Sequence, residues 1–216
     1  MIDADELLEL QRNTRAMRRL STEPVADALV DQILRAGLCA PSGGNRQNWH
    51  FIVVRDAYIK KQIQRFYKRA FDEVVGPHYA SSSPAPGSDA SRHQRQHAAV
   101  EHLTDHFHEA PVWIVACLDL GEGAHTFASG ASIYPAVQNM LLAARALGLG
   151  ATLTTRHTLH GREVDVILQL PKGARSYAIL PIGHPLGEFG PVTRATEGMI
   201  STDIWGAPRN LDFNGA

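Results

Sequence analysis

The stretch APSGGNRQNWHFIVVRD, residues 40–56, holds the change from a helical to an extended pattern that sets the class of fold. A helix that can begin at Pro24 has apolar residues at helical spacing as far as Leu38. Pro41 ends this helix, because proline cannot donate to the helical hydrogen bonds. The run 49–56 is apolar and rich in β-branched residues, which predicts a buried strand.

The turn inside this stretch has the chemistry of a binding site as well as that of a simple loop. Because glycine has no Cβ, the backbone N–H groups around Ser42, Gly43 and Gly44 can approach a ligand closely. The amides of Asn45 and Gln47 offer both donors and acceptors, which suits a ring edge that alternates C=O and N–H. Taken alone, the composition favours a turn over a binding site.

Outward from the stretch, helical and strand patterns are mixed without strict βαβ alternation, which predicts the α+β class and a single domain over 1–216. Further helices are predicted at 3–12, 58–75, 93–109, 129–150 and 161–171. Further strands are predicted at 111–120, from 151 onward and at 176–185. Residues 76–92 are rich in Gly, Ser, Pro and Ala and predict a mobile loop of the kind that often covers an active site.

The composition suits a globular protein and excludes some partners. The 216 residues carry a formal net charge of −1 and are 44% hydrophobic, so no basic field is present to hold nucleic acid or an acidic membrane. Cys39 and Cys117 lie in apolar runs and predict free thiols in a reducing compartment. No signal segment is visible, and no apolar run reaches the ~20 residues that cross a bilayer. We expect a soluble, cytoplasmic protein with no nucleic-acid or membrane partner.

Arginines gather near the N-terminus, and a further one stands far along the chain. They are Arg12, Arg15, Arg18 and Arg19, with Arg194 in the C-terminal segment. A guanidinium fork matches a phosphate dianion in both geometry and charge. Arg15 and Arg18 are three residues apart, so a helical turn would place them on one side. For the cluster alone, a solvated helix face is the favoured interpretation.

Histidines are the other unusual group. His93 and His97 are four residues apart, as are His102 and His106, and such pairs can hold a metal. No HExxH pattern and no nearby cysteine accompanies them, so solvated or packing histidines are favoured and no metal site is predicted. A metal-binding module over 93–108 is the alternative. The sequence also has no GxGxxG motif, no P-loop and no nucleophile elbow.

Four motifs in a fixed order carry more information than any one of them. An arginine segment that ends in RRL is followed by EPV, then by the opening stretch, then by AVQNMLLAARALGLGATL (136–153). The last motif is PIGHPLGEFGPVTR (181–194), followed by DIWG. In this order the chain resembles the nitroreductase family of FMN-dependent oxidoreductases over roughly residues 9–206.

The resemblance implies a three-layer α+β fold with a central mixed, mostly antiparallel sheet flanked by helices. It also implies an intertwined homodimer with two FMN sites at the subunit interface. Residues 57–109 match the family least and are expected to form a variable insertion that covers the substrate. Residues 190–216 are expected to form a C-terminal arm that packs on the partner subunit.

The resemblance also implies which residues bind FMN. The arginine segment and Arg194 would bind the phosphate, the loop after Pro41 would face the ribityl chain and the ring, and the backbone after Thr152 would approach the N5 and O4 edge. The full set is Arg15, Ala16, Met17, Arg18, Arg19, Pro41, Ser42, Gly43, Asn45, Gln47, Leu153, Thr154, Thr155 and Arg194. Thr14, Ala16 and Asn48 depart from the common family pattern, so Arg15, Arg18 and Arg19 stay equal candidates for the phosphate.

The implied reaction passes a hydride from NAD(P)H through the flavin N5 to an electron-poor acceptor by a ping-pong scheme. The acceptor is a nitroaromatic, a quinone, an activated alkene or free flavin, and no catalytic side chain is required. Phe71, Tyr79 and Phe107 are the candidates to stack on the acceptor. One alternative is a protein of this fold that stores FMN without turnover. Another is an enzyme that uses reduced flavin with oxygen.

Overall fold

The computed structural model describes residues 3–192, 194 and 198–209. Its helices are α1 (Ala4–Asn13), α2 (Asp27–Leu38), α3 (Ala57–Ala70), α4 (Gly76–Ser81), α5 (Ala90–His106), α6 (Tyr134–Ala146) and α7 (Gly161–Ile167). Short 3₁₀ or π turns are η1 (Gly43–Asn45), η2 (Phe71–Val75), η3 (Phe107–Glu109), η4 (Phe127–Ser132) and η5 (Arg156–His160). The strands are β1 (Trp49–Val54), β2 (Val112–Asp119), β3 (Gly150–Ala151) and β4 (Ala174–Gly183).

The strands form one sheet in the order β1-β2-β4-β3. Every pair in it is antiparallel, with Trp49 opposite Leu118 and Val112 opposite Ile182. The described residues therefore contain the antiparallel part of the expected sheet and no parallel pair. The α+β class is confirmed.

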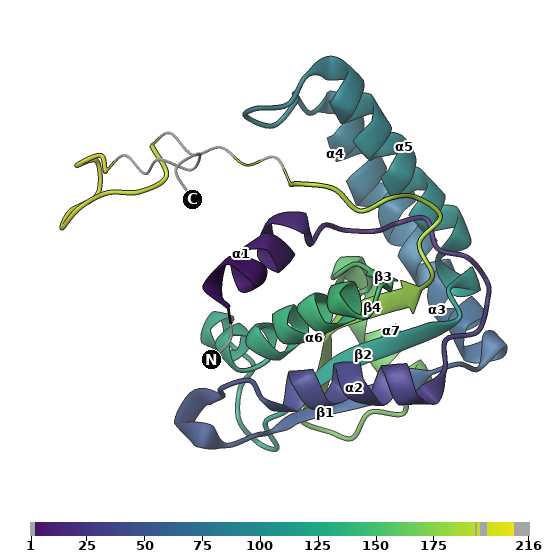
Figure 1. Ribbon diagram of the computed structural model, residues 1–216. Helices are drawn as coiled ribbons and strands as arrows, with labels where there is room; N and C mark the ends of the chain where they lie inside the picture. Colours follow the sequence, from purple (N-terminus) through teal and green to yellow (C-terminus); the bar gives the residue numbers. More distant parts are fainter. Residues whose placement is uncertain (1–2, 193, 195–197, 210–216) are drawn as a thin grey trace.

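Helices cover both faces of this sheet and make three layers (Figure 1). On one face, Ile114 of β2 shares a buried cluster with Ile33 of α2 and Met140 of α6. On the other face, Val115 shares a cluster with Ile63 of α3. Because successive side chains of β2 point to opposite faces, a strand between two helical layers is apolar at nearly every position. This explains the continuous apolar run in the sequence.

Aspartates start several helices by satisfying backbone N–H groups that have no partner inside the helix. The side chain of Asp56 accepts from the backbone N–H of Ile59 at 2.8 Å at the start of α3. Asp89 accepts from the N–H of Arg92 at 2.7 Å at the start of α5. These caps fix where the helices of the 57–109 segment begin.

The structure corrects several predicted boundaries. The helix expected from Pro24 begins at Asp27, and the one expected from 129 begins at Tyr134 after the η4 turn. The predicted loop at 76–92 is wrong in its first part, because the chain continues through the π turn η2 into α4. Pro77 is compatible with this, since a proline in the first helical turn lacks only an N–H that needs no partner there. The third strand is shorter than expected and spans only Gly150–Ala151.

Two parts of the chain lie apart from the sheet. In Figure 1, α4 and part of α5 project beyond it, and the described C-terminal residues 198–209 run away from the helices. Ile204 is 72% and Trp205 100% exposed in this segment. The expected arm at 190–216 includes positions outside the described residues. Among the described helices, none has the length and apolar character needed to cross a membrane.

Candidate functional site

A cavity of about 350 Å³ lies where the arginine segment meets α6 and the exit of β3. Four separate parts of the chain line it: Gln11, Thr14, Arg15, Ala16, Arg18, Gln138, Leu141, Arg145, Leu149, Ala151, Thr152, Leu153, Phe189, Val192 and Arg194. These parts are far apart in sequence, so the fold alone creates the cavity.

Backbone hydrogen bonds hold the arginine segment in place along the sheet. The N–H of Met17 donates to the carbonyl of Ala151 at 3.0 Å, and the N–H of Val192 donates to the carbonyl of Arg12 at 2.9 Å. Gly150 permits this approach, because a Cβ there would lie 2.7 Å from Cδ2 of Leu20. The arginine side chains are thus presented from a backbone that is fixed on both sides.

The cavity carries strong positive charge. Arg15, Arg18, Arg145 and Arg194 line it, and none of its described lining residues is acidic. The guanidinium of Arg145 lies 3.9 Å from the centre of the Phe189 ring, and its Nε donates to the carbonyl of Asn13 at 3.4 Å. Burial lowers the pKa of Arg18, and the charge of Arg15 contributes in the same direction. Several guanidinium groups gathered at one cavity, two of them (Arg18 and Arg145) partly buried, favour the binding of an anion.

The rest of the lining is apolar. Leu141, Leu149 and Leu153 provide aliphatic surface beside the arginines. Leu153 is 38% exposed, which is unusual for a leucine that follows a buried strand. A cavity with a cationic end and an aliphatic wall suits a ligand that joins a phosphate to a flat ring.

Several residues predicted from the sequence meet at this cavity. Arg15, Ala16, Arg18, Leu153 and Arg194 all line it. Four more predicted residues adjoin these in the chain but do not line the cavity: Met17, Arg19, Thr154 and Thr155.

Neighbouring predicted residues support the cavity or lie outside its lining. Met17 is buried, and its backbone anchors the segment as described above. The carbonyl of Arg19 accepts from the N–H of Leu186 at 3.0 Å, while its side chain is exposed. Thr154 is buried with its hydroxyl 3.1 Å from the Tyr67 hydroxyl, whereas Thr155 is exposed.

The predicted site residues of the loop 41–47 lie away from this cavity. Pro41, Ser42, Gly43, Asn45 and Gln47 do not line this cavity. The N–H of Gly43 donates to the Ser132 hydroxyl at 3.0 Å, just before α6 begins, whereas the cavity is lined by Gln138, Leu141 and Arg145 of that helix. Within one chain, the loop 41–47 and the arginine segment therefore do not line the same cavity.

The loop has an ordered and unusual backbone. Gly44, Asn45 and Gln47 all have positive φ, at 59°, 52° and 50°, a region that costs energy for residues other than glycine. The Ser42 hydroxyl accepts from the N–H of Gln47 at 2.9 Å and closes the turn. Asn48 donates from Nδ2 to the carbonyl of Asp119 at 2.9 Å, which a proline at this position could not do.

The three aromatic candidates for substrate stacking differ in their surroundings. Phe71 and Tyr79 are half-buried, and the Tyr79 ring meets the His97 ring edge-on at 4.7 Å. Phe107 is fully buried between the rings of Tyr67 and Trp113, at 4.0 and 4.2 Å. Its assignment as a stacking residue is therefore wrong, because it packs in the core.

Gln138, Arg145 and Phe189 were missed from the sequence although they line the cavity. A signal was present for the first two, because residues 138, 141 and 145 recur at a spacing that places them on one helix face. An arginine within an apolar helix is a further signal. Nothing in the sequence pattern indicated Phe189, whose place depends on the course of the C-terminal segment.

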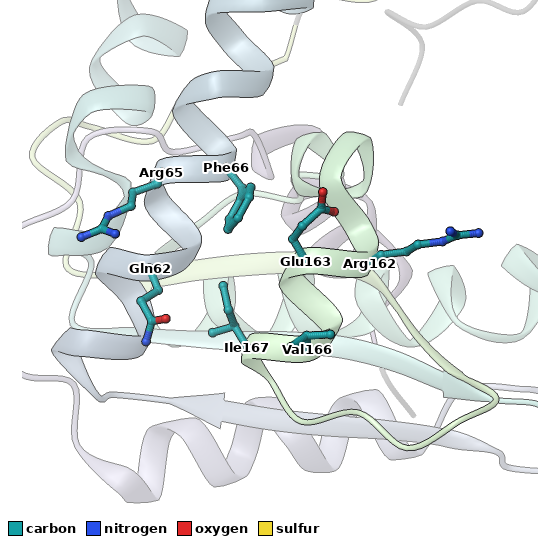
Figure 2. Close-up of a pocket in the computed structure, with 7 residues that line it drawn as sticks. All are labelled: Gln62, Arg65, Phe66, Arg162, Glu163, Val166 and Ile167. Carbon is teal, nitrogen blue, oxygen red and sulfur yellow. The ribbon is translucent and has the colours of Figure 1, made fainter.

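A second cavity, of about 500 Å³, lies between α3 and α7 (Figure 2). Phe66 and Ile167 face each other across it, while Arg65 and Arg162 point away on opposite sides. None of the predicted site residues lines it. The described residues contain no group of three or more His, Cys, Asp or Glu side chains placed to hold a metal, so the metal-module alternative has no ligand set there.

Comparison with known proteins decides the family. The model of the nitroreductase family matches residues 12–184. The chain belongs to the nitroreductase family. This agrees with the resemblance inferred from the order of the motifs.

Individual members of the nitroreductase family support the same assignment. The NADH dehydrogenase of Thermus thermophilus is 30% identical over 194 residues, which cover 83% of this chain and 87% of that protein. The structure of iodotyrosine deiodinase bound to FMN and 3-iodo-L-tyrosine is 25% identical, with a TM-score of 0.69, and the match covers 88% of this chain and 95% of that one. A nitroreductase with bound FMN from Bacteroides fragilis is 21% identical with a TM-score of 0.67, and the match covers 91% of this chain and 98% of that one. This likeness supports the fold alone.

Proposed function

We propose that this protein is an FMN-dependent oxidoreductase that takes a hydride from NAD(P)H and passes it to an electron-poor acceptor. The observation that carries the proposal is the cavity lined by four arginines and aliphatic side chains, with no acidic side chain among the described lining residues. FMN has the matching parts, because it joins a phosphate dianion to a flat ring. The FMN-bound iodotyrosine deiodinase of the same fold supports the choice of ligand.

In this proposal the arginines have separate tasks. Arg15 and Arg194 pair with the phosphate, and Arg145, held by Phe189, adds charge at the same end. Bound FMN supplies hydride acceptance and return at N5. Arg18 would add positive charge to the site and so favour the reduced, negatively charged flavin. No side-chain acid or nucleophile is needed.

We further propose that the site is completed by a second copy of the chain. The loop with Ser42, Asn45 and Gln47 is ordered, exposes its polar side chains and lines no cavity with the arginines. In a homodimer it would supply the ribityl and ring contacts to the partner's arginines. The exposed Ile204 and Trp205 support packing of the 190–216 arm on the partner, since large apolar side chains are rarely left so exposed.

The 57–109 segment is proposed to cover the acceptor. Phe71 and Tyr79 remain its candidate stacking residues, because both are partly accessible. A second candidate reaction, reductive removal of a halogen from an aromatic amino acid, is favoured by the likeness to iodotyrosine deiodinase. It uses the same cavity and differs only in the acceptor.

The first test is the visible spectrum of the purified protein, before and after incubation with FMN. We expect bound, oxidised flavin that loses its visible absorbance when NADH or NADPH is added without oxygen. Absorbance that returns on adding a nitroaromatic or quinone supports the reductase, and return with 3-iodotyrosine supports dehalogenation. Protein that cannot be loaded contradicts the proposal. Bound FMN that neither nicotinamide reduces would instead favour the storage function, and oxygen uptake without other acceptors would favour the oxygen-dependent enzyme.

A further inference from the structure

Arg156 is held in a fixed orientation beside the candidate site by side chains of the 57–109 segment. Its guanidinium carbon lies 4.3 Å from the centre of the Tyr67 ring and 5.1 Å from that of Phe71. Its Nη1 donates to the Thr104 hydroxyl. Tyr67 is fully buried, so the surface on which the guanidinium rests is rigid. Two rings and one neutral acceptor thus position a planar cation.

The charge of Arg156 is not balanced by any carboxylate among the described residues. None of the ion pairs found there includes Arg156. Two acidic groups of the elements that hold Arg156 have other partners: Glu73 pairs with Arg69 at 2.7 Å and Asp105 with Lys68 at 3.4 Å. Such a cation, partly withdrawn from water, is stabilised when an anion binds to it.

A second arginine reinforces this positive charge. Burial is the main cause that lowers the pKa of Arg156, Tyr67 and Tyr79 oppose it, and the charge of Arg18 lowers it further. Arg18 itself lines the main cavity. The charges of the two arginines therefore interact, and one of them lines the cavity while the other is held by the covering segment.

The position of Arg156 relates it to the acceptor. It follows directly after Thr154 and Thr155, and the Thr154 hydroxyl is 3.1 Å from the Tyr67 hydroxyl. In the proposed function this backbone approaches the flavin ring, and the inference rests on that function for the position of the ring. Arg156 then lies between the ring and the aromatic residues of the cover.

We propose that Arg156 binds a carboxylate carried by the electron acceptor and so selects aromatic or conjugated acids over neutral compounds. The guanidinium fork accepts a planar carboxylate through two parallel hydrogen bonds. Phe71 and Tyr79 then lie beside the acceptor's ring. The phosphates of NAD(P)H are the other anions that reach such a site. Separate measurement of the two half-reactions distinguishes them from the carboxylate of the acceptor.

The direct test is calorimetric binding of benzoate and of its neutral analogue benzamide to the oxidised, FMN-loaded protein. We expect the wild-type protein to bind benzoate at least about tenfold more tightly than benzamide. Arg156→Gln should abolish this preference, and Arg156→Lys should keep part of it, because it keeps the charge and loses the fork. Arg162→Gln, at an exposed arginine of α7, is the matched control and should change nothing.

The outcome separates this inference from the proposed function, because FMN content is measured first for each protein. Failure to load FMN counts against the function, whereas the ratio of benzoate to benzamide affinity reports on Arg156 alone. Equal affinities in the wild-type protein, or a preference that survives in Arg156→Gln, would overturn the inference.

Half-reactions identify which substrate carries the anion. Reoxidation of the reduced protein by 4-nitrobenzoate should slow at least about tenfold in Arg156→Gln, and reoxidation by 4-nitrobenzamide should change by less than about twofold. Reduction by NADH should be unaffected. A loss confined to reduction by NADH would assign the arginine to the nicotinamide's phosphates and overturn the inference.

Discussion

At the scale of single residues, the arginines are the strongest link between sequence and function. Arg15→Ala removes one cation from a cavity whose described lining residues include no acidic one. We expect FMN to bind about tenfold or more weakly, because a charge-assisted hydrogen bond contributes about 1.5–3 kcal/mol. Titration of apo-protein with FMN by fluorescence quenching measures this. Arg65→Ala, at an exposed arginine on α3, is the control, and equal weakening in both variants would contradict a specific phosphate contact.

His157 makes the stability of the protein depend on pH. It is fully buried, and this burial lowers its pKa to about 4, opposed in part by the Ser176 backbone. The unfolded chain takes up the proton near the ordinary histidine pKa of about 6.5, so protonation favours unfolding. Stability is full above that pH and should fall by about 3 kcal/mol as the pH drops from 6.5 towards 4.

Urea unfolding across this pH range measures the effect. His157→Leu should flatten the dependence, because a leucine in the same place has no proton to gain. An unchanged slope in this variant would show that other groups cause the loss of stability.

At the residue scale, the sequence identified arginines that line the cavity, and it misjudged residues whose place depends on packing. Arg15, Arg18 and Arg194 were identified by charge and by motif. Phe107 was misassigned because its burial depends on Tyr67 and Trp113, which lie on other elements. Arg156 was overlooked because its ring contacts come from α3 and from the π turn that follows it.

At the scale of elements, some turns need backbone conformations that the periodicity of the sequence does not predict. Gly173 has φ of +97°, and a Cβ there would lie 2.1 Å from the carbonyl oxygen of Gly121. Gly173→Ala should therefore destabilise the protein by at least about 2 kcal/mol. Thermal or urea unfolding tests this. Gly161→Ala is the matched control, because helical φ and open space surround Gly161, and a comparable loss there would contradict the explanation.

Strands and helices were predicted well where one pattern ran without interruption. β2 and β4 match their predicted runs because both are buried between helical layers. The third strand was overestimated, because its β-branched residues continue past Ala151 while the backbone leaves the sheet. It returns only at Thr154, which exchanges backbone hydrogen bonds with Ile179 at 3.1 and 2.9 Å. That break is what exposes Leu153 to the cavity.

At the scale of the whole molecule, the order of the motifs predicted the family and the α+β class. It did not predict that the loop with Gln47 lies away from the arginine cavity. The loop with Gln47 and the segment with Arg15 both carry the family pattern, yet only the second lines the cavity. Sequence order does not reveal whether two motifs act within one chain or across two.

Mixed dimers test whether each FMN site draws on both chains of the proposed homodimer. A dimer of one Arg15→Ala chain and one Gln47→Ala chain should contain one unaltered site and one doubly altered site, if each site draws on both chains. We expect half of the FMN to bind with wild-type affinity, measured by titration of the purified mixed dimer. If no wild-type site remains, both motifs act within one chain and the proposed assembly is wrong.

The central claim is that the arginine cavity holds FMN through its phosphate. The most direct measurement compares the affinities of the apo-protein for FMN and for riboflavin, which has the same ring and no phosphate. The arginines predict that FMN binds at least about 100-fold more tightly at low salt, since several charge-assisted contacts are lost together. Equal affinities for the two flavins, or no binding of either, would contradict the claim.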